Sequence, residues 1–211
     1  YCFEQNGLLL AVLEALGFHA RPISARVRLQ RTREEPAPRT HVFVRVELDG
    51  ASWLADVGVG GLSPTAALRL VPDLVQPTPH ETRRIVVDGP LYFHQALLGG
   101  VWSDVCEFTL EEMPLIDREL GNWFTSTHPQ SHFRHRLLVA RAAPDGVRKT
   151  ILNDEFSVRG REGHAETQKL ASLDALLAVL AEHFGLHFPA GTHFGKGAWP
   201  DGIAFDSYGN L

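Results

Sequence analysis

The sequence has 211 residues, of which 44% are hydrophobic and 21% are charged, and its formal net charge is −5. A chain of this size can bury the core of one large domain or two small ones. It contains no run of about 18 apolar residues, so we expect no membrane span. The mild negative charge argues against a nucleic-acid binder, which needs a basic face. Two cysteines, Cys2 and Cys106, are too few for a disulfide framework, so we expect free thiols in a reducing cytoplasm.

The first half of the chain predicts a helix followed by strands. Residues 2–16 form the helix, because apolar side chains recur at near-helical spacing until Gly17, namely Phe3, Leu9, Leu10, Leu13 and Leu16. Residues 20–29 alternate apolar and arginine side chains, which predicts a half-buried strand with Arg26 and Arg28 on its polar face. A polar loop covers residues 30–40, and two strand-like runs then flank Asp49-Gly50, a strong hairpin signal.

The second half predicts more strands and one helix. Strand-like runs cover residues 83–89, 92–98 and 105–110, and an extended segment begins at Gly121. Two further strands, Leu137–Arg141 and Lys149–Leu152, flank a turn at residues 144–146. A helix over residues 172–184 has Ser172 as its N-cap and ends at Gly185. Because strands and helices occur in runs rather than in regular alternation, the pattern indicates an α+β fold.

Cys2 stands at the start of the first predicted helix. The unpaired N–H groups and the dipole at a helix N-terminus stabilise a thiolate, which is the nucleophilic form of cysteine. A buried, inert cysteine is the common alternative, so the position alone does not establish chemistry.

The predicted hairpin brings a histidine and an aspartate together. With a two-residue turn at Asp49-Gly50, Val44 pairs with Ala55, and His41 lies diagonal to Asp56 on one face of the sheet. An imidazole oriented by a carboxylate is the base that a thiol nucleophile needs. The alternative is a surface histidine at a strand end and an aspartate before a turn.

Four motifs of this sequence resemble the arylamine N-acetyltransferase family: YCFEQN, THVFVRV, WLADVGVGG and NWFTSTHPQSHF. The resemblance implies a cysteine-proteinase-like α+β fold with a helical segment, an antiparallel β-barrel and an α/β lid. It implies that residues 1–19 are the remnant of a helical N-terminal domain, residues 20–122 the barrel and residues 123–195 the lid. Residues 196–211 are expected to be a tail or the start of a second domain, and they resemble the opening of a gluconolactonase-like or NHL-type propeller.

The resemblance also implies an activity. Cys2, His41 and Asp56 would form the triad of a ping-pong transferase that moves an acetyl group from acetyl-CoA to an arylamine, arylhydroxylamine or hydrazine. Two sets of further contacts follow, to CoA from Thr127, His128 and Ser131, and to the acceptor from Val59, Gly60 and Phe124. Val59 stands where the family usually has phenylalanine, which leaves the acceptor preference open. The oligomeric state is not predicted.

Several alternatives remain beside this interpretation. An amide synthase would use the same triad with a carrier-bound polyketide, and a non-catalytic interaction domain would use Cys2 for packing. A papain-like peptidase fits the THVFVRV and NWFTSTHP motifs poorly. Arg134 and Arg136 suit an alternating strand better than a phosphate site. The spacing of His128, His132 and His135 matches no standard zinc pattern, so we expect no metal.

Overall fold

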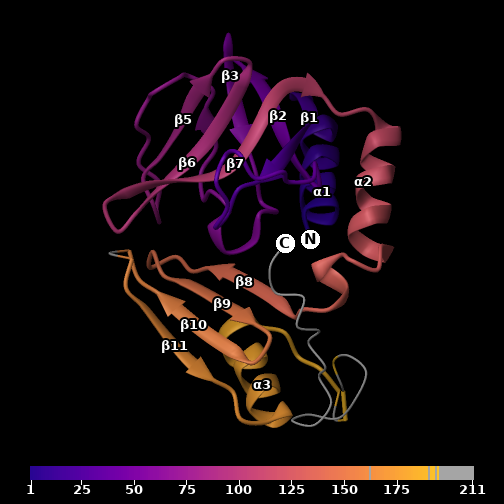
Figure 1. Cartoon of the computed structure of the whole chain (residues 1–211), viewed down its shortest axis with the longest axis vertical. Helices are drawn as coiled ribbons and strands as arrows, with labels where there is room; N and C mark the ends of the chain where they lie inside the picture. The colour runs from indigo at the N-terminus through magenta and orange to yellow at the C-terminus, as the bar shows by residue number, and fades with distance from the viewer. Residues whose placement is uncertain (162, 190, 193, 195–211) are drawn as a thin grey trace. The chain divides into compact units, whose positions relative to one another are not determined.

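The computed structural model describes residues 1–161, 163–189, 191–192 and 194, and the chain divides into two compact units after Phe124. Figure 1 shows the elements of each unit. The domain boundaries expected at residues 19, 122 and 195 stay predictions, and the expected propeller-like tail at 196–211 lies outside the described residues. No helix in the described part of the chain is long and apolar enough to cross a membrane.

The first unit begins with helix α1, Cys2–Ala15, which confirms the predicted helix. Its buried residues are Cys2, Asn6 and Leu10, which succeed one another at intervals of four and therefore share one face. Helix α1 packs against β1 and β2, beside which it lies in Figure 1. Leu16 was expected in the apolar stripe but is 69% exposed, because the helix has ended at Ala15.

Seven strands of the first unit form one antiparallel sheet in the order β4-β3-β2-β1-β7-β6-β5. Their bounds are β1 His19–Val27, β2 His41–Leu48, β3 Ala51–Ala55, β4 Leu68–Arg69, β5 Arg83–Asp88, β6 Leu91–Leu98 and β7 Val101–Glu112. The segment after β4 bridges to β5 at Pro72–Ile85 and Gln76–Arg83, so the sheet nearly closes into a barrel. The predicted α+β class with an antiparallel barrel is confirmed.

The interior of the barrel-like sheet is aromatic and aliphatic. Phe43 and Phe108 meet edge to face with ring centroids 4.9 Å apart, and Leu54, Ile85 and Val105 are fully buried around them. Aromatic pairs in this geometry add to the stabilisation that burial already provides. The result is a rigid support for the strand ends that carry His41 and Asp56.

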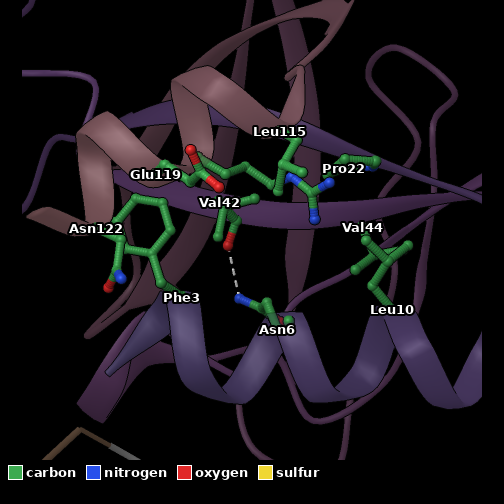
Figure 2. Close-up of a pocket in the computed structure, with 11 residues that line it drawn as sticks. Phe3, Asn6, Leu10, Pro22, Val42, Val44, Leu115, Glu119 and Asn122 are labelled. Carbon is green, nitrogen blue, oxygen red and sulfur yellow. Dashed lines mark hydrogen bonds between the residues drawn. The ribbon is translucent and has the colours of Figure 1, made fainter.

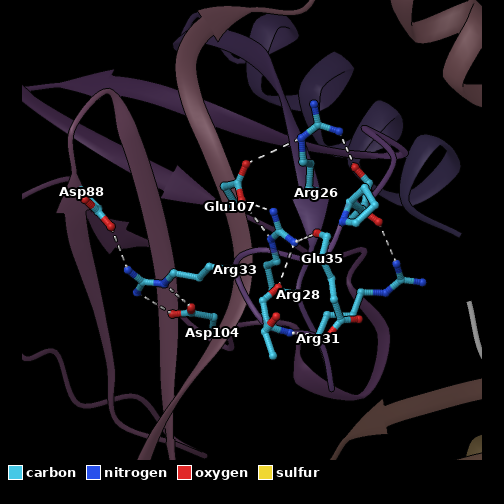
Figure 3. A network of polar contacts seen from close by, with 11 residues as sticks. Arg26, Arg28, Arg31, Arg33, Glu35, Asp88, Asp104 and Glu107 are labelled. Carbon is cyan, nitrogen blue, oxygen red and sulfur yellow. Dashed lines mark hydrogen bonds and ion pairs between the residues drawn. The ribbon is translucent and has the colours of Figure 1, made fainter.

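Arginines hold the loop between β1 and β2 (Figure 3). Arg28 was expected on the polar face of a strand, but it is only 5% exposed and lies just beyond the end of β1. Its Nε donates to Glu107 Oε2 at 2.9 Å, and its NH1 donates to the carbonyls of Thr32 and Glu35 at 3.1 and 2.5 Å. The buried charge is therefore paired, and the same side chain fixes the path of the loop toward His41.

Helix α2, Leu115–Thr127, replaces the extended segment expected from Gly121 onward. The Pro114 carbonyl accepts the first helical bonds, from the N–H groups of Asp117 and Arg118, and an acidic residue in the first turn suits the helix dipole. A Cβ at Gly121 would lie 2.6 Å from the Phe3 ring, so the missing side chain lets α2 approach α1. Packing thus overrides the strand-like composition of residues 122–127.

The second unit contains a four-stranded antiparallel sheet in the order β11-β10-β9-β8 and a C-terminal helix. Its elements are the 3₁₀ turn η2 His132–Arg134, β8 Leu138–Ala142, β9 Arg148–Leu152, β10 Glu155–Arg159, β11 Ala165–Lys169, α3 Leu173–Val179 and the π-helical turn η3 Leu180–Phe184. The predicted strands β8 and β9 and the Ser172 cap are confirmed, since Ser172 Oγ accepts from the Ala175 N–H. The strand expected at Arg134 and Arg136 is wrong, because β8 begins only at Leu138.

A buried polar cluster lies in the first unit at β5 and β6. Arg83 has no exposed surface, and its NH2 is 2.8 Å from Glu81 Oε2 while its NH1 is 3.1 Å from His94 Nε2. Burial first, and then the charge of Arg83, lower the pKa of His94 from 6.5 to about 3. His94 is therefore neutral in the folded protein at neutral pH and accepts a hydrogen bond from Arg83.

Acid should destabilise the protein through His94. Between pH 6.5 and about 3 the unfolded chain protonates this histidine and the folded chain does not. The free energy of unfolding should therefore fall as the pH drops through this window, by up to about 1.4 kcal/mol per pH unit from this group. His94→Gln keeps an acceptor for Arg83 but takes up no proton. Urea unfolding from pH 7 to 4 should show a shallower slope for the variant; equal slopes would contradict the account.

Candidate active site

Cys2 is the first residue of α1 and is 3% exposed. The helix places its sulfur at the positive end of the dipole, where a thiolate is stabilised. The Sγ–H group donates to the Thr40 carbonyl at 3.4 Å, and Cys2 is one of the neighbours that raise the pKa of His41. The predicted nucleophile thus lies beside the predicted base.

The β2–β3 hairpin supplies that base and its partner. Asp49 and Gly50 both have positive φ, at 51° and 72°, which gives a two-residue turn of the kind that matches the twist of the strands. The predicted register is confirmed, since Val44 pairs with Ala55. His41 Nε2 lies 2.9 Å from Asp56 Oδ2, and both side chains are buried. The second ring nitrogen, Nδ1, takes no part in this hydrogen bond.

The charges of this pair stabilise each other. Burial alone would lower the pKa of His41, but the Asp56 carboxylate and then Cys2 more than offset it and raise that pKa to about 10. Burial would raise the pKa of Asp56, yet His41, Asn6 and the Gly58 N–H hold it below its usual value. At neutral pH the pair is therefore an imidazolium beside a carboxylate, with the Cys2 side chain next to the imidazolium.

A second thiol, Cys106 on β7, lies next to the pair. One atom from each of His41, Asp56 and Cys106 falls within 4.8 Å of the other two, a spacing that a metal ion would also need. His41 and Asp56 already bond each other, however, and burial raises the pKa of the Cys106 thiol, which keeps it protonated. The chemistry of this set fits a hydrogen-bonded pair and a packed thiol better than a metal centre. Cys2, at a helix N-terminus and next to His41, is the better candidate for the nucleophile.

The remaining predicted residues fall in two places. Val59 is half-buried against the core of the barrel-like sheet, and Gly60 begins the short 3₁₀ turn η1, Gly60–Leu62, with φ at 77°. Thr127, His128 and Ser131 belong to the second unit, where Ser131 Oγ donates to the Thr125 carbonyl and is buried. Their roles toward CoA or an acceptor stay predictions, as does that of Phe124.

Sequence reasoning missed two residues that complete the site. Asn6 lies one turn after Cys2 and bonds Asp56, and Gly58 lies directly against Cys2. Helical spacing of four from a candidate nucleophile was the available signal for Asn6. Asn6 also lines a pocket between α1, β2 and α2, shown in Figure 2, but the three predicted catalytic side chains do not line it.

Comparison with known proteins agrees with this geometry. The sequence model of the N-acetyltransferase family matches residues 1–192. The arylamine N-acetyltransferase of Escherichia coli K12 is 43% identical over 187 residues, which cover 88% of this chain and 66% of the relative. A Salmonella typhimurium relative named arylamine N-acetyltransferase / N-hydroxyarylamine O-acetyltransferase is 38% identical, with the same coverage. This chain thus spans about two thirds of the length of these curated relatives.

A solved structure supports the same assignment. The arylamine N-acetyltransferase of Mycobacterium marinum in complex with CoA superposes with a TM-score of 0.83 at 35% identity, covering 88% of this chain and 69% of the other. Fold, sequence and the arrangement of Cys2, His41 and Asp56 lead to one conclusion. The chain belongs to the arylamine N-acetyltransferase family.

Proposed function

We propose that this chain transfers an acetyl group from acetyl-CoA to an arylamine, arylhydroxylamine or hydrazine through an acetyl-Cys2 intermediate. The observation that carries the proposal is the buried hydrogen bond of 2.9 Å between His41 and Asp56, with Cys2 next to the imidazole. The names of the relatives support arylamine and hydroxyarylamine acceptors, and the CoA bound to the M. marinum enzyme supports the donor.

Each residue of the triad has one role in the proposed reaction. The Cys2 thiolate attacks the thioester carbonyl, the C–S bond to CoA breaks, and the CoA thiolate takes the proton of His41. The neutral amine then attacks acetyl-Cys2, His41 takes the proton of the nitrogen, and the Cys2 thiolate leaves. Asp56 holds the imidazole orientation and stabilises its charge throughout. Backbone N–H groups at the start of α1 are the candidates for binding the oxyanion.

Contacts to the two substrates extend the proposal. Thr127, His128 and Ser131 would contact CoA, and Val59, Gly60 and Phe124 would contact the acceptor. Because Val59 is smaller than phenylalanine, the acceptor site would be wide at this position. We place the reaction in the cytoplasm, since both cysteines are free thiols and Cys2 must stay reduced to react.

Intact mass spectrometry tests the first half-reaction. Mixed with acetyl-CoA and no acceptor, the protein should gain one acetyl group on Cys2 and lose it when an arylamine is added. Cys2→Ala should gain none. Cys106→Ala, the matched control, should still be acetylated, because that buried thiol takes no part.

Two other results would change the proposal. A protein whose Cys2 reacts with iodoacetamide but takes no acetyl group from acetyl-CoA would indicate a carrier-bound acyl donor, as in an amide synthase. Absence of both adducts from a folded protein would leave a non-catalytic interaction domain.

Asp56→Asn should abolish most of the chemistry without disturbing the fold. Asn6 and the Gly58 N–H both donate to Oδ1, so the new amide keeps its oxygen there and turns its NH2 toward His41. His41 Nε2 must then accept, which puts the proton on Nδ1 and removes the base facing Cys2. The single-turnover rate of Cys2 acetylation should fall by about 10³–10⁴-fold. A loss smaller than about 10-fold would contradict the assigned orientation.

A further inference from the structure

We propose that Asn6 is a positioning residue for this reaction: its side-chain amide fixes the orientation of Asp56 and ties the helix of Cys2 to the His41–Asp56 hairpin. The inference rests on the proposed function. Asn6 is 1% exposed and lies four residues after Cys2, so both side chains face the hairpin from the same side of α1.

The hydrogen bonds of Asn6 reach three separate places. Its Nδ2 donates to Asp56 Oδ1 at 2.9 Å and to the Val42 carbonyl at 2.7 Å, the latter drawn in Figure 2. Its Oδ1 accepts from the Val57 N–H at 2.9 Å. Because both donors and the acceptor are in use, only one orientation of the amide satisfies the site. One side chain therefore joins α1 to β2, beside His41, and to the turn after β3, beside Asp56.

These bonds decide which oxygen of Asp56 meets the base. Oδ1 accepts from Asn6 Nδ2 and from the Gly58 N–H at 2.9 and 2.8 Å, which leaves Oδ2 for His41. Rotating the carboxylate would break all of these hydrogen bonds together. Hydrogen bonds to the charged form also favour the carboxylate in this dry setting, and an ionised Asp56 is what holds His41 protonated.

Gly58 shows how closely the turn after β3 approaches helix α1. A Cβ on this residue would lie 2.6 Å from Asn6 Nδ2 and 2.7 Å from the Cys2 Cα. The backbone of the turn thus rests directly on α1, and no larger residue fits without moving the helix. The amide of Asn6 therefore lies between the Asp56 carboxylate and the turn after β3. Both neighbours have fixed positions, as expected around a side chain that orients a catalytic group.

The pH profile of Cys2 alkylation separates a positioning role from a structural one. In the whole protein, without acetyl-CoA, iodoacetamide labelling would be followed at Cys2 by peptide mass spectrometry. Asn6→Leu keeps the branching of the side chain, although its methyl groups are larger than the amide atoms, and removes every hydrogen bond. Leu10→Ala, one turn further along the same buried face, is the matched control, because it weakens packing without touching Asp56.

The expected result is a change of profile in the Asn6 variant alone. Wild type should be labelled nearly as fast at about pH 6.5 as at about pH 9.5, as the activated thiolate of the proposed function requires. Asn6→Leu should lose about 10-fold or more of the rate at the lower pH and little at the higher one. Leu10→Ala should melt at a lower temperature yet keep the wild-type ratio. If Asn6→Leu does not fold, Asn6→Ser serves, because the short side chain cannot reach Asp56 and leaves room for water.

Two outcomes would overturn the inference, and a third bears on the proposed function. A wild-type ratio in the Asn6 variants, or the same loss in Leu10→Ala, would leave Asn6 a structural residue only. A wild-type protein that is labelled only above about pH 8 would overturn the activated thiolate of the proposed function itself, and the positioning role with it. A reactive wild type with an altered Asn6 variant supports the positioning role whatever the acyl donor is.

Discussion

The hydrogen bond between His41 and Asp56 is the interaction on which the rest of the site depends. Both side chains are withdrawn from water, and burying either charge alone would be costly. Paired at 2.9 Å, each holds the other in its charged form, so a protonated imidazole stands ready beside Cys2 at neutral pH. Several constraints in the fold keep these two side chains in contact and shielded from water.

Those constraints come from four parts of the fold. The Asp49-Gly50 turn sets the strand register that aligns His41 with Asp56, and the aromatic interior of the sheet supports the strands from behind. The loop before His41 is tied down by the buried pair of Arg28 and Glu107. Helix α1 packs against the hairpin and completes the site. Every charge in this arrangement has a partner, which is why so many ionisable groups can lie near one another inside a small unit.

Patterns in the sequence predicted those features of the fold that depend on residues close together in the chain. The hairpin and its register follow from two turn residues and alternating side chains, so His41 and Asp56 could be brought together from the sequence. Residues whose place depends on distant partners could not: α2 forms where the composition favours an extended chain, because Gly121 allows close packing on Phe3. In the sequence alone Asn6 looks like an ordinary helix residue. Its role becomes apparent only in the structure, where the turn after β3 lies against it.

The central proposal is that an activated Cys2 thiolate reacts beside a protonated His41. The ultraviolet absorbance of the thiolate, taken as the difference between wild type and Cys2→Ala across a pH titration, measures this directly. The account predicts a thiolate signal already present at about pH 6, well below the titration of an ordinary cysteine. A signal that appears only above about pH 8, with the protein folded, would contradict it.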